Sequence, residues 1–205
     1  ILSKTRRSQV ELEEGSRVSL TVVIAAYNEA SNLERRIRDI FECSYPSGNV
    51  DVLVVSDGST DGTGDLVRSL AAEDERVKLL EVSPQSGRAN AHNEGSRMAE
   101  GEVMVFTDAE TSFGPDFLKE IARPFSNPKV GFSSGSLSYT NDTAGIARSS
   151  GLYWQLEQTV RRNESECDLF AFGSGACCAV RRELFRDVPP TGDIDFTTPL
   201  DVVLQ

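Results

Sequence analysis

Apolar residues in this chain fall into short continuous runs that alternate with segments of helical spacing. The runs have strand length and stand at four places: 20–26, 50–55, 77–82 and 102–107. A continuous apolar strand is expected where both faces of a parallel sheet are buried. The segments between them predict helices at 30–42, from Asp61 or Thr63 onward, and at 88–99. This strand–helix alternation predicts an α/β fold with an open, mostly parallel sheet and flanking helices.

The alternation loosens in the second half of the chain. Pro115 suits the first turn of a helix running to about Phe125. Beyond it, the pattern predicts strands near 130–134 and 176–180 and a long helix at about 146–162. Residues 1–17 are polar and charged, which is typical of a linking segment. No linker divides the rest, so we expect one domain over 18–205. The chain begins without Met and ends on Val-Val-Leu-Gln, so we expect it to be part of a larger protein.

Charge and cysteine content narrow the function class. The net charge of −11 argues against nucleic-acid binding. An acidic protein that binds a diphosphate also needs a local cation, from Arg or Lys or from a metal held by carboxylates. The four cysteines lack C-x-x-C spacing, which disfavours a zinc site and suggests reduced thiols in a cytoplasmic protein. No apolar run reaches the ~20 residues that span a bilayer, although segments outside the chain could contact a membrane.

Polar or glycine-rich residues follow each of the four predicted strands. In an open parallel sheet, ligands bind outside the carboxyl ends of the strands, so these residues are the candidates for a site. In chain order they are Ala26-Tyr27-Asn28-Glu29, Ser56-Asp57-Gly58-Ser59, Ser86-Gly87-Arg88 with Asn93 beyond it, and Asp108-Ala109-Glu110.

These residue types indicate a nucleotide diphosphate and a metal. Asp108 and Glu110 offer hard oxygen ligands that suit Mg²⁺ or Mn²⁺. Gly87 allows close backbone approach, and the guanidinium of Arg88 matches phosphate geometry. Asp57 can accept a hydrogen bond from a base or a ribose, or it can cap its own turn.

Two aromatic side chains near these motifs allow more than one interpretation. Tyr27 offers a flat face for a base or is an ordinary half-buried tyrosine. His92 is expected to pack rather than to take part in chemistry. P-loop and dinucleotide-binding motifs are absent from the sequence.

With these motifs in place, the chain resembles the family 2 glycosyltransferases of the GT-A fold. The most specific stretch is DVLVVSDGSTDGT, and VVIAAYNEASNL resembles the opening strand and loop of the family. SGRANAHNEG is similar to its G-K-x-x-A-x-N-x-G segment with arginine in place of lysine, and VMVFTDAE to its D-x-D segment. The resemblance implies the donor-contacting residues Ala26, Tyr27, Glu29, Asp57, Gly87, Arg88, Asn93 and Asp108, and the metal ligands Asp108 and Glu110.

The resemblance extends to the acceptor side. GSGACCAVRRELF resembles the acceptor segment of the family, and GDIDFTTPLDVVLQ the segment that ends on the general base. By that match Asp195 is the expected base, and Asp193 is the alternative. Ile194 stands where a second acid is common.

The resemblance implies metal-assisted, inverting transfer from a nucleotide sugar, with a UDP-sugar favoured, to a glycan or lipid hydroxyl. It also implies a protein of the cytoplasm, or of the cytoplasmic face of a membrane. Two alternatives stay open. A sugar-1-phosphate nucleotidyltransferase would need a glycine-rich basic loop after the first strand, which Ala26-Tyr27-Asn28-Glu29 does not provide. A non-catalytic nucleotide-sugar-binding domain would not depend on Asp195.

Overall fold

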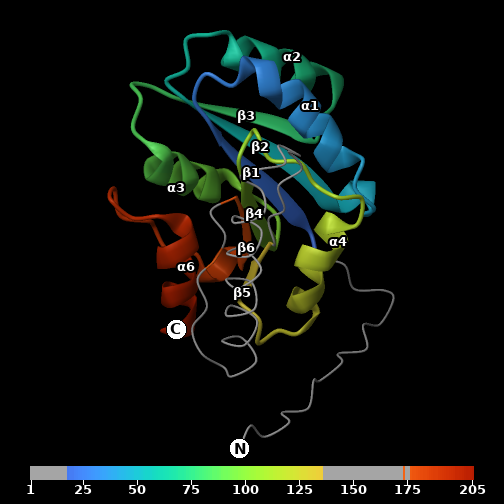
Figure 1. The fold of residues 1–205 in the computed structure, drawn as a ribbon, viewed down its shortest axis with the longest axis vertical. Helices are drawn as coiled ribbons and strands as arrows, with labels where there is room; N and C mark the ends of the chain where they lie inside the picture. Colours follow the sequence, from blue (N-terminus) through green and yellow to red (C-terminus); the bar gives the residue numbers. More distant parts are fainter. Residues whose placement is uncertain (1–17, 136–172, 174–175) are drawn as a thin grey trace, which may run out of the picture.

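A six-stranded sheet forms the centre of the computed structural model, which describes residues 18–135, 173 and 176–205. The strands are β1 (Leu20–Ala26), β2 (Val50–Asp57), β3 (Val77–Val82), β4 (Val103–Thr107), β5 (Phe132–Ser134) and β6 (Cys177–Arg181). Their order is β3-β2-β1-β4-β6-β5. The first four pair in parallel, whereas β6 runs antiparallel to β4 and β5. The predicted fold class is therefore confirmed (Figure 1).

Helices cover both faces of this sheet. They are α1 (Ala30–Phe41), α2 (Thr63–Glu73), α3 (Arg88–Met98), α4 (Phe117–Ala122) and α6 (Ile194–Val203), with 3₁₀ turns at Ser47–Asn49, Arg123–Ser126 and Arg182–Leu184. The predicted helix to Phe125 is shorter than expected, because Pro124 has no N–H to donate to the carbonyl of Glu120. The helix predicted at 146–162 lies outside the described residues.

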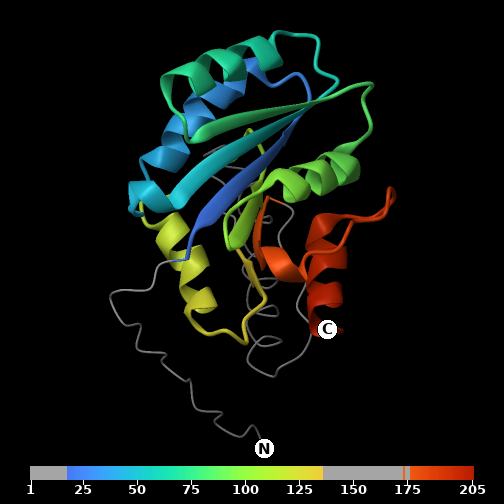
Figure 2. The same cartoon turned by 180° about the vertical axis from the view of Figure 1, so that it is seen from behind.

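The side chains of β1 show how the layers are built. Leu20, Val22 and Ile24 belong to a buried cluster that includes residues of α1, α2 and α4. Val23 points to the opposite face, in a cluster with residues of α3 and α6. The result is three layers, and α3 and α6 lie side by side on one face of the sheet in both views (Figures 1 and 2).

Helix α3 packs closely against the sheet at Gly95. A Cβ atom there would lie 2.7 Å from Cγ1 of Val23 and 3.0 Å from Cγ2 of Val55. Glycine therefore lets the helix approach β1 and β2 more closely than any other residue would.

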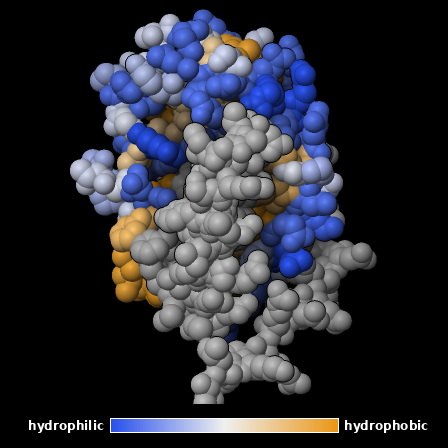
Figure 3. Space-filling model, viewed as in Figure 1, coloured by the Kyte–Doolittle hydropathy of each residue, from blue (hydrophilic) through white to orange (hydrophobic). Residues whose placement is uncertain are grey.

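The described surface is hydrophilic over α1 and α2 and apolar along α6 (Figure 3). The exposed apolar residues of α6 and of the residue after it are Phe196, Leu200, Val203 and Leu204. Within the described part of the chain, no helix combines the length and the apolar character needed to cross a membrane. Cys43, Cys177 and Cys178 are buried free thiols, as expected, and Cys167 lies outside the described residues.

Candidate active site

The loops that follow β1 and β2 are joined by hydrogen bonds. The backbone N–H of Asn28 donates to Oγ of Ser59 (3.1 Å), and the N–H of Thr60 donates to Oδ1 of Asn28 (2.8 Å). Asp61 accepts from the N–H of Ala30 at 3.1 Å. Asn28 adopts a left-handed conformation (φ 57°), which asparagine tolerates better than most residues. The two loops therefore behave as one unit, in which polar side chains bind backbone groups.

Three of the residues predicted to contact the nucleotide sugar belong to the end of β1 and the loop after it. Ala26 is buried at the end of β1, whereas the side chain of Tyr27 is 48% exposed and its ring can receive a base. Glu29 accepts a hydrogen bond from Nδ2 of Asn32 through Oε2 (2.7 Å), and its N–H donates to Oγ1 of Thr63. Donor contacts by these residues stay predictions.

Asp57 holds the loop that precedes α3. Oδ1 accepts from both the N–H and the hydroxyl of Ser86 at 2.8 Å, and Oδ2 accepts from the N–H of Gly87 at 2.7 Å. The side chain is buried. The structure thus gives Asp57 a role that the sequence analysis did not predict, because its carboxylate holds the loop before α3 and not its own turn. A contact with a base or ribose stays a prediction.

A cation already lies against the first candidate metal ligand. Nη2 of Arg88 donates to Oδ1 of Asp108 at 2.5 Å. Burial raises the pKa of Asp108; the charge of Arg88 opposes this shift, and the charge of Glu110 adds to it. Glu110 is exposed but near enough to act on Asp108 electrostatically. The structure thus brings together Arg88, Asp108 and Glu110.

This pair of carboxylates fits a divalent cation that takes its other ligands from elsewhere. No group of three or more His, Cys, Asp or Glu residues suited to a metal occurs among the described residues. Mg²⁺ and Mn²⁺ in phosphate-binding sites are commonly held by one or two carboxylates, with phosphate oxygens and water completing the shell. Asp108 and Glu110 can supply that number of ligands.

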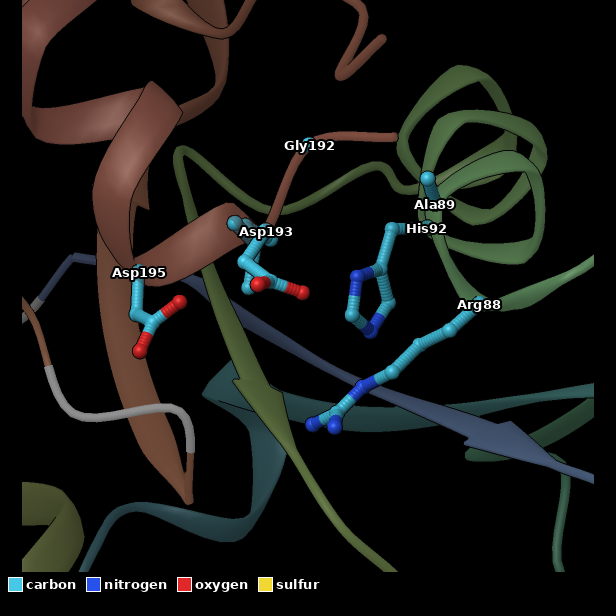
Figure 4. Close-up of a pocket in the computed structure, with 7 residues that line it drawn as sticks. Arg88, Ala89, His92, Gly192, Asp193 and Asp195 are labelled. Carbon is cyan, nitrogen blue, oxygen red and sulfur yellow. The ribbon is translucent and has the colours of Figure 1, made fainter. Parts of the chain in front are cut away.

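A cavity of about 250 Å³ opens between the N-termini of α3 and α6. Its lining residues are Arg88, Ala89, His92, Gly192, Asp193, Ile194 and Asp195. Figure 4 shows the carboxylate of Asp193 pointing toward His92, and Asp195, in the first turn of α6, farther from that ring. Both candidate bases therefore face the space that Arg88 also lines.

The candidate base, the candidate phosphate contact and the candidate metal ligand come from three separate segments of the chain. Asp195 and Arg88 line the same cavity, and Arg88 is paired with Asp108. The same charges act on the buried thiol of Cys178 in β6. Its pKa is raised to about 12, chiefly by burial, with the charges of Asp195 and Asp108 acting in the same direction and that of Arg88 against it.

Asp195 is held through its backbone by an interaction that the sequence analysis missed. Its carbonyl accepts a hydrogen bond from the N–H of Gly173 at 2.7 Å. The usual helical donor to that carbonyl would be residue 199, which is a proline without an N–H. A Cβ on Gly173 would lie 3.0 Å from the Asp195 carbonyl oxygen and 2.9 Å from the ring of Phe132. The proline four residues after the candidate base is the sequence feature that indicates a carbonyl in need of a donor from elsewhere in the chain.

His92 packs, as expected, but also lines the cavity. Its ring is buried and meets the ring of Phe106 edge-on, with centroids 5.1 Å apart. Burial lowers the pKa of His92 to about 3, and the charge of Arg88 acts in the same direction. The imidazole is therefore neutral at physiological pH.

Asn93, which was expected to contact the nucleotide sugar, forms its hydrogen bonds with the protein itself. Its Nδ2 donates to the carbonyl of Val188 (3.0 Å), and its Oδ1 accepts from the N–H of Val188 (2.8 Å). The side chain is buried and does not line the cavity. It joins α3 to the segment that leads into α6, and contact with a donor stays a prediction.

The glycosyl transferase family 2 profile matches residues 21–188, which is most of the chain. The protein belongs to this family. Glycosyltransferase AglE of Haloferax volcanii is 25% identical over 174 residues, which cover 83% of this chain and 55% of that protein. The beta-monoglucosyldiacylglycerol synthase of Nostoc sp. is 29% identical over 133 residues, which cover 64% of this chain and 28% of the synthase. The chain thus spans about half the length of its curated relatives, or less.

Solved structures support the same assignment. The mannosyltransferase PcManGT from Pyrobaculum calidifontis, in complex with GDP-Man and Mn²⁺, superposes with a TM-score of 0.76 at 28% identity. The match covers 92% of this chain and 52% of that one. TarS 1–349 of S. aureus in complex with UDP has a TM-score of 0.59 at 15% identity, with 90% and 54% covered, and supports the fold alone. The domain has the GT-A fold, and the similar structure of PcManGT holds a nucleotide sugar.

Proposed function

We propose that this domain transfers a sugar from a nucleoside-diphosphate sugar to an acceptor hydroxyl, with inversion at the anomeric carbon. The observation that supports it best is the cavity lined by both Asp195 and Arg88, whose guanidinium is paired with Asp108. A base on one side and diphosphate-binding groups on the other are what a single displacement needs.

Asp195 takes the role of general base. It lies in the first turn of α6, where the helix dipole favours negative charge. Its carboxylate accepts the proton of the acceptor hydroxyl as that oxygen attacks the sugar. Because Asp193 lines the same cavity, it is the alternative base.

The diphosphate side is formed by α3 and the segment after β4. Arg88 exchanges its bond to Asp108 for the diphosphate. Gly87, whose N–H is held by Asp57, has no side chain and so allows the diphosphate to approach the backbone closely. Asp108 and Glu110 would hold Mg²⁺ or Mn²⁺, which stabilises the negative charge of a departing diphosphate. Mn²⁺ accompanies GDP-Man in the complex of PcManGT, which supports this assignment.

Two nucleotides, UDP and GDP, are the candidates for the donor. The motif resemblance favours a UDP-sugar, whereas PcManGT holds GDP-Man. The acceptor belongs to the class of glycan or lipid hydroxyls. The relatives include a beta-monoglucosyldiacylglycerol synthase and a poly-beta-1,6-N-acetyl-D-glucosamine synthase.

Turnover of donor by wild type, Asp195→Asn and Asp193→Asn tests the proposal. Each protein is incubated with Mn²⁺ and UDP-glucose, UDP-GlcNAc or GDP-mannose, with water serving as the acceptor of the sugar, and the released nucleoside diphosphate is measured. We expect wild type and Asp193→Asn to release one nucleotide and Asp195→Asn to release almost none while still binding donor. NMR of the first sugar released should show the anomer opposite to that of the donor.

Loss of turnover in Asp193→Asn instead would move the base to Asp193. Equal turnover in all three proteins would show that neither residue is the base. A folded wild type that binds donor but never releases nucleotide would support the non-catalytic binding domain.

A further inference from the structure

A fully buried arginine on α1 lies beneath the segment that carries the candidate metal ligands. The side chain of Arg36 has 0% exposure. Arginine is seldom fully buried unless it is paired, because removing its charge from water is costly. The reaction proposed above does not use this residue. Its neighbours belong to residues 108–113, which we call the acidic loop.

Arg36 holds the start of the acidic loop. Its Nη2 donates to Oγ1 of Thr107 at 2.9 Å, and its Nε donates to the backbone carbonyl of Asp108 at 3.3 Å. The hydroxyl of Thr107 in turn donates to the carbonyl of Ala176. The guanidinium is therefore bonded directly to the backbone of the first candidate metal ligand.

The same guanidinium holds the end of the loop. Nη1 of Arg36 donates to Oδ2 of Asp39 at 2.5 Å, and that oxygen also accepts from the N–H of Phe113 at 2.8 Å. The guanidinium carbon lies 3.8 Å from the ring centroid of Phe113. One planar group thus spans both ends of a six-residue segment, a geometry that a lysine ammonium cannot reproduce.

We infer that Arg36 is a positioning residue, which fixes the acidic loop so that Asp108 and Glu110 can hold a divalent cation together. The inference rests on the proposed function. Hydrogen-bond partners behind metal ligands typically change metal affinity by about 10- to 100-fold when they are removed. Arg36 acts through backbone and through Asp39, and it does not line the cavity of Arg88 and Asp195.

The test compares Mn²⁺ affinity in wild type, Arg36→Lys, Asp39→Asn and a control. Arg38→Met is the control, because Arg38 is an exposed arginine of α1 that forms a surface ion pair with Glu34. Mn²⁺ is titrated calorimetrically in the presence of UDP or GDP, whichever wild type binds. We expect Mn²⁺ to bind about 10-fold more weakly or worse to Arg36→Lys. Asp39→Asn should show a smaller loss, and Arg38→Met none.

Thermal unfolding of each variant separates positioning from a purely structural role. A structural role lowers the unfolding midpoint and leaves the Mn²⁺ affinity of the folded protein unchanged, a result that would overturn the inference alone. If Arg36→Lys does not fold, Asp39→Asn and Phe113→Leu carry the test, and wild-type affinity in both overturns it. A wild type that binds no Mn²⁺ with either nucleotide overturns the inference and the metal-assisted function together.

Discussion

The loops after β1 and β2 and the N-terminus of α6 hold their acidic residues in opposite ways. In the loops, Asp57 and Asp61 direct their carboxylates at backbone N–H groups of neighbouring loops. At α6, Asp193 makes no capping hydrogen bond, and Asp195 is held through its carbonyl by Gly173.

The carboxylates of the loops are thus structural, whereas those at α6 are the candidates for the proposed chemistry. A carboxylate that accepts several N–H groups is committed to holding backbone. Holding Asp195 by its main chain fixes its position and leaves the carboxylate directed at the cavity. Changes on the donor side should therefore alter binding, and changes at α6 should alter turnover.

The largest expected effect is loss of metal-dependent binding in Asp108→Asn. We expect nucleotide affinity in Mn²⁺ to fall by more than about 100-fold, because a direct ligand matters more than its supporting partners. Calorimetric titration measures it. Asp116→Asn, which changes an exposed carboxylate at the start of α4, is the control and should bind as wild type does. If Asp108→Asn bound the nucleotide as tightly as wild type does, Asp108 would not be part of the nucleotide-binding site.

A smaller effect, in two directions, is expected for Arg88→Met. Diphosphate affinity should fall about 30-fold, the range for hydrogen bonds to charged groups. Affinity for Mn²⁺ without nucleotide should rise, because Asp108 loses its competing cation. Both are measured by titration. A fall in both affinities would show that Arg88 supports the metal instead of competing with it.

Gly173→Ala should reduce turnover about 10-fold with little change in nucleotide affinity. The added methyl group would push on the Asp195 carbonyl and on Phe132 and so displace the candidate base. Such overpacking also typically lowers the free energy of unfolding by about 1–3 kcal/mol. Donor turnover and nucleotide titration are compared. Gly48→Ala is the control, since its Cβ would meet nothing within 4 Å. If Gly173→Ala weakened nucleotide binding and left turnover unchanged, the division between a binding side and a turnover side would be wrong.

The smallest effect concerns His92, which lines the cavity beside Asp193 and Asp195. Its pKa is depressed from 6.5 to about 3, so the unfolded chain binds the extra proton between these values. The free energy of unfolding should therefore decrease as pH falls from about 6.5 toward 3, by at most about 1.4 kcal/mol per pH unit. Denaturant unfolding of wild type and His92→Gln measures the difference, and identical slopes would show that His92 is protonated when folded.

Local pattern was enough to predict much of the sheet. The bounds of β1 and β3 agree with the predicted runs, because short segments rich in Val, Leu and Ile have the length of strands and are too short for helices. The convergence of Arg88 with Asp108 followed from the rule that parallel strands end at one edge. The antiparallel direction of β6 did not follow, since periodicity carries no information about strand direction.

Contacts between distant segments account for what the sequence did not reveal. Asn93 binds Val188, and Arg36 binds the acidic loop, through pairs that share no local motif. Only tertiary packing brings these segments together, so the local sequence around each residue does not indicate its partner. Pro199 was visible in the sequence, but its consequence for Asp195 needed the position of Gly173.

Calorimetric titration of UDP and GDP, each with Mn²⁺ and again with EDTA, tests the central claim most directly. The account predicts micromolar binding of one nucleotide with Mn²⁺ and much weaker binding with EDTA. A folded protein that binds neither nucleotide under either condition would contradict the assignment of a nucleotide-sugar site to the edge formed by Arg88, Asp108 and Glu110.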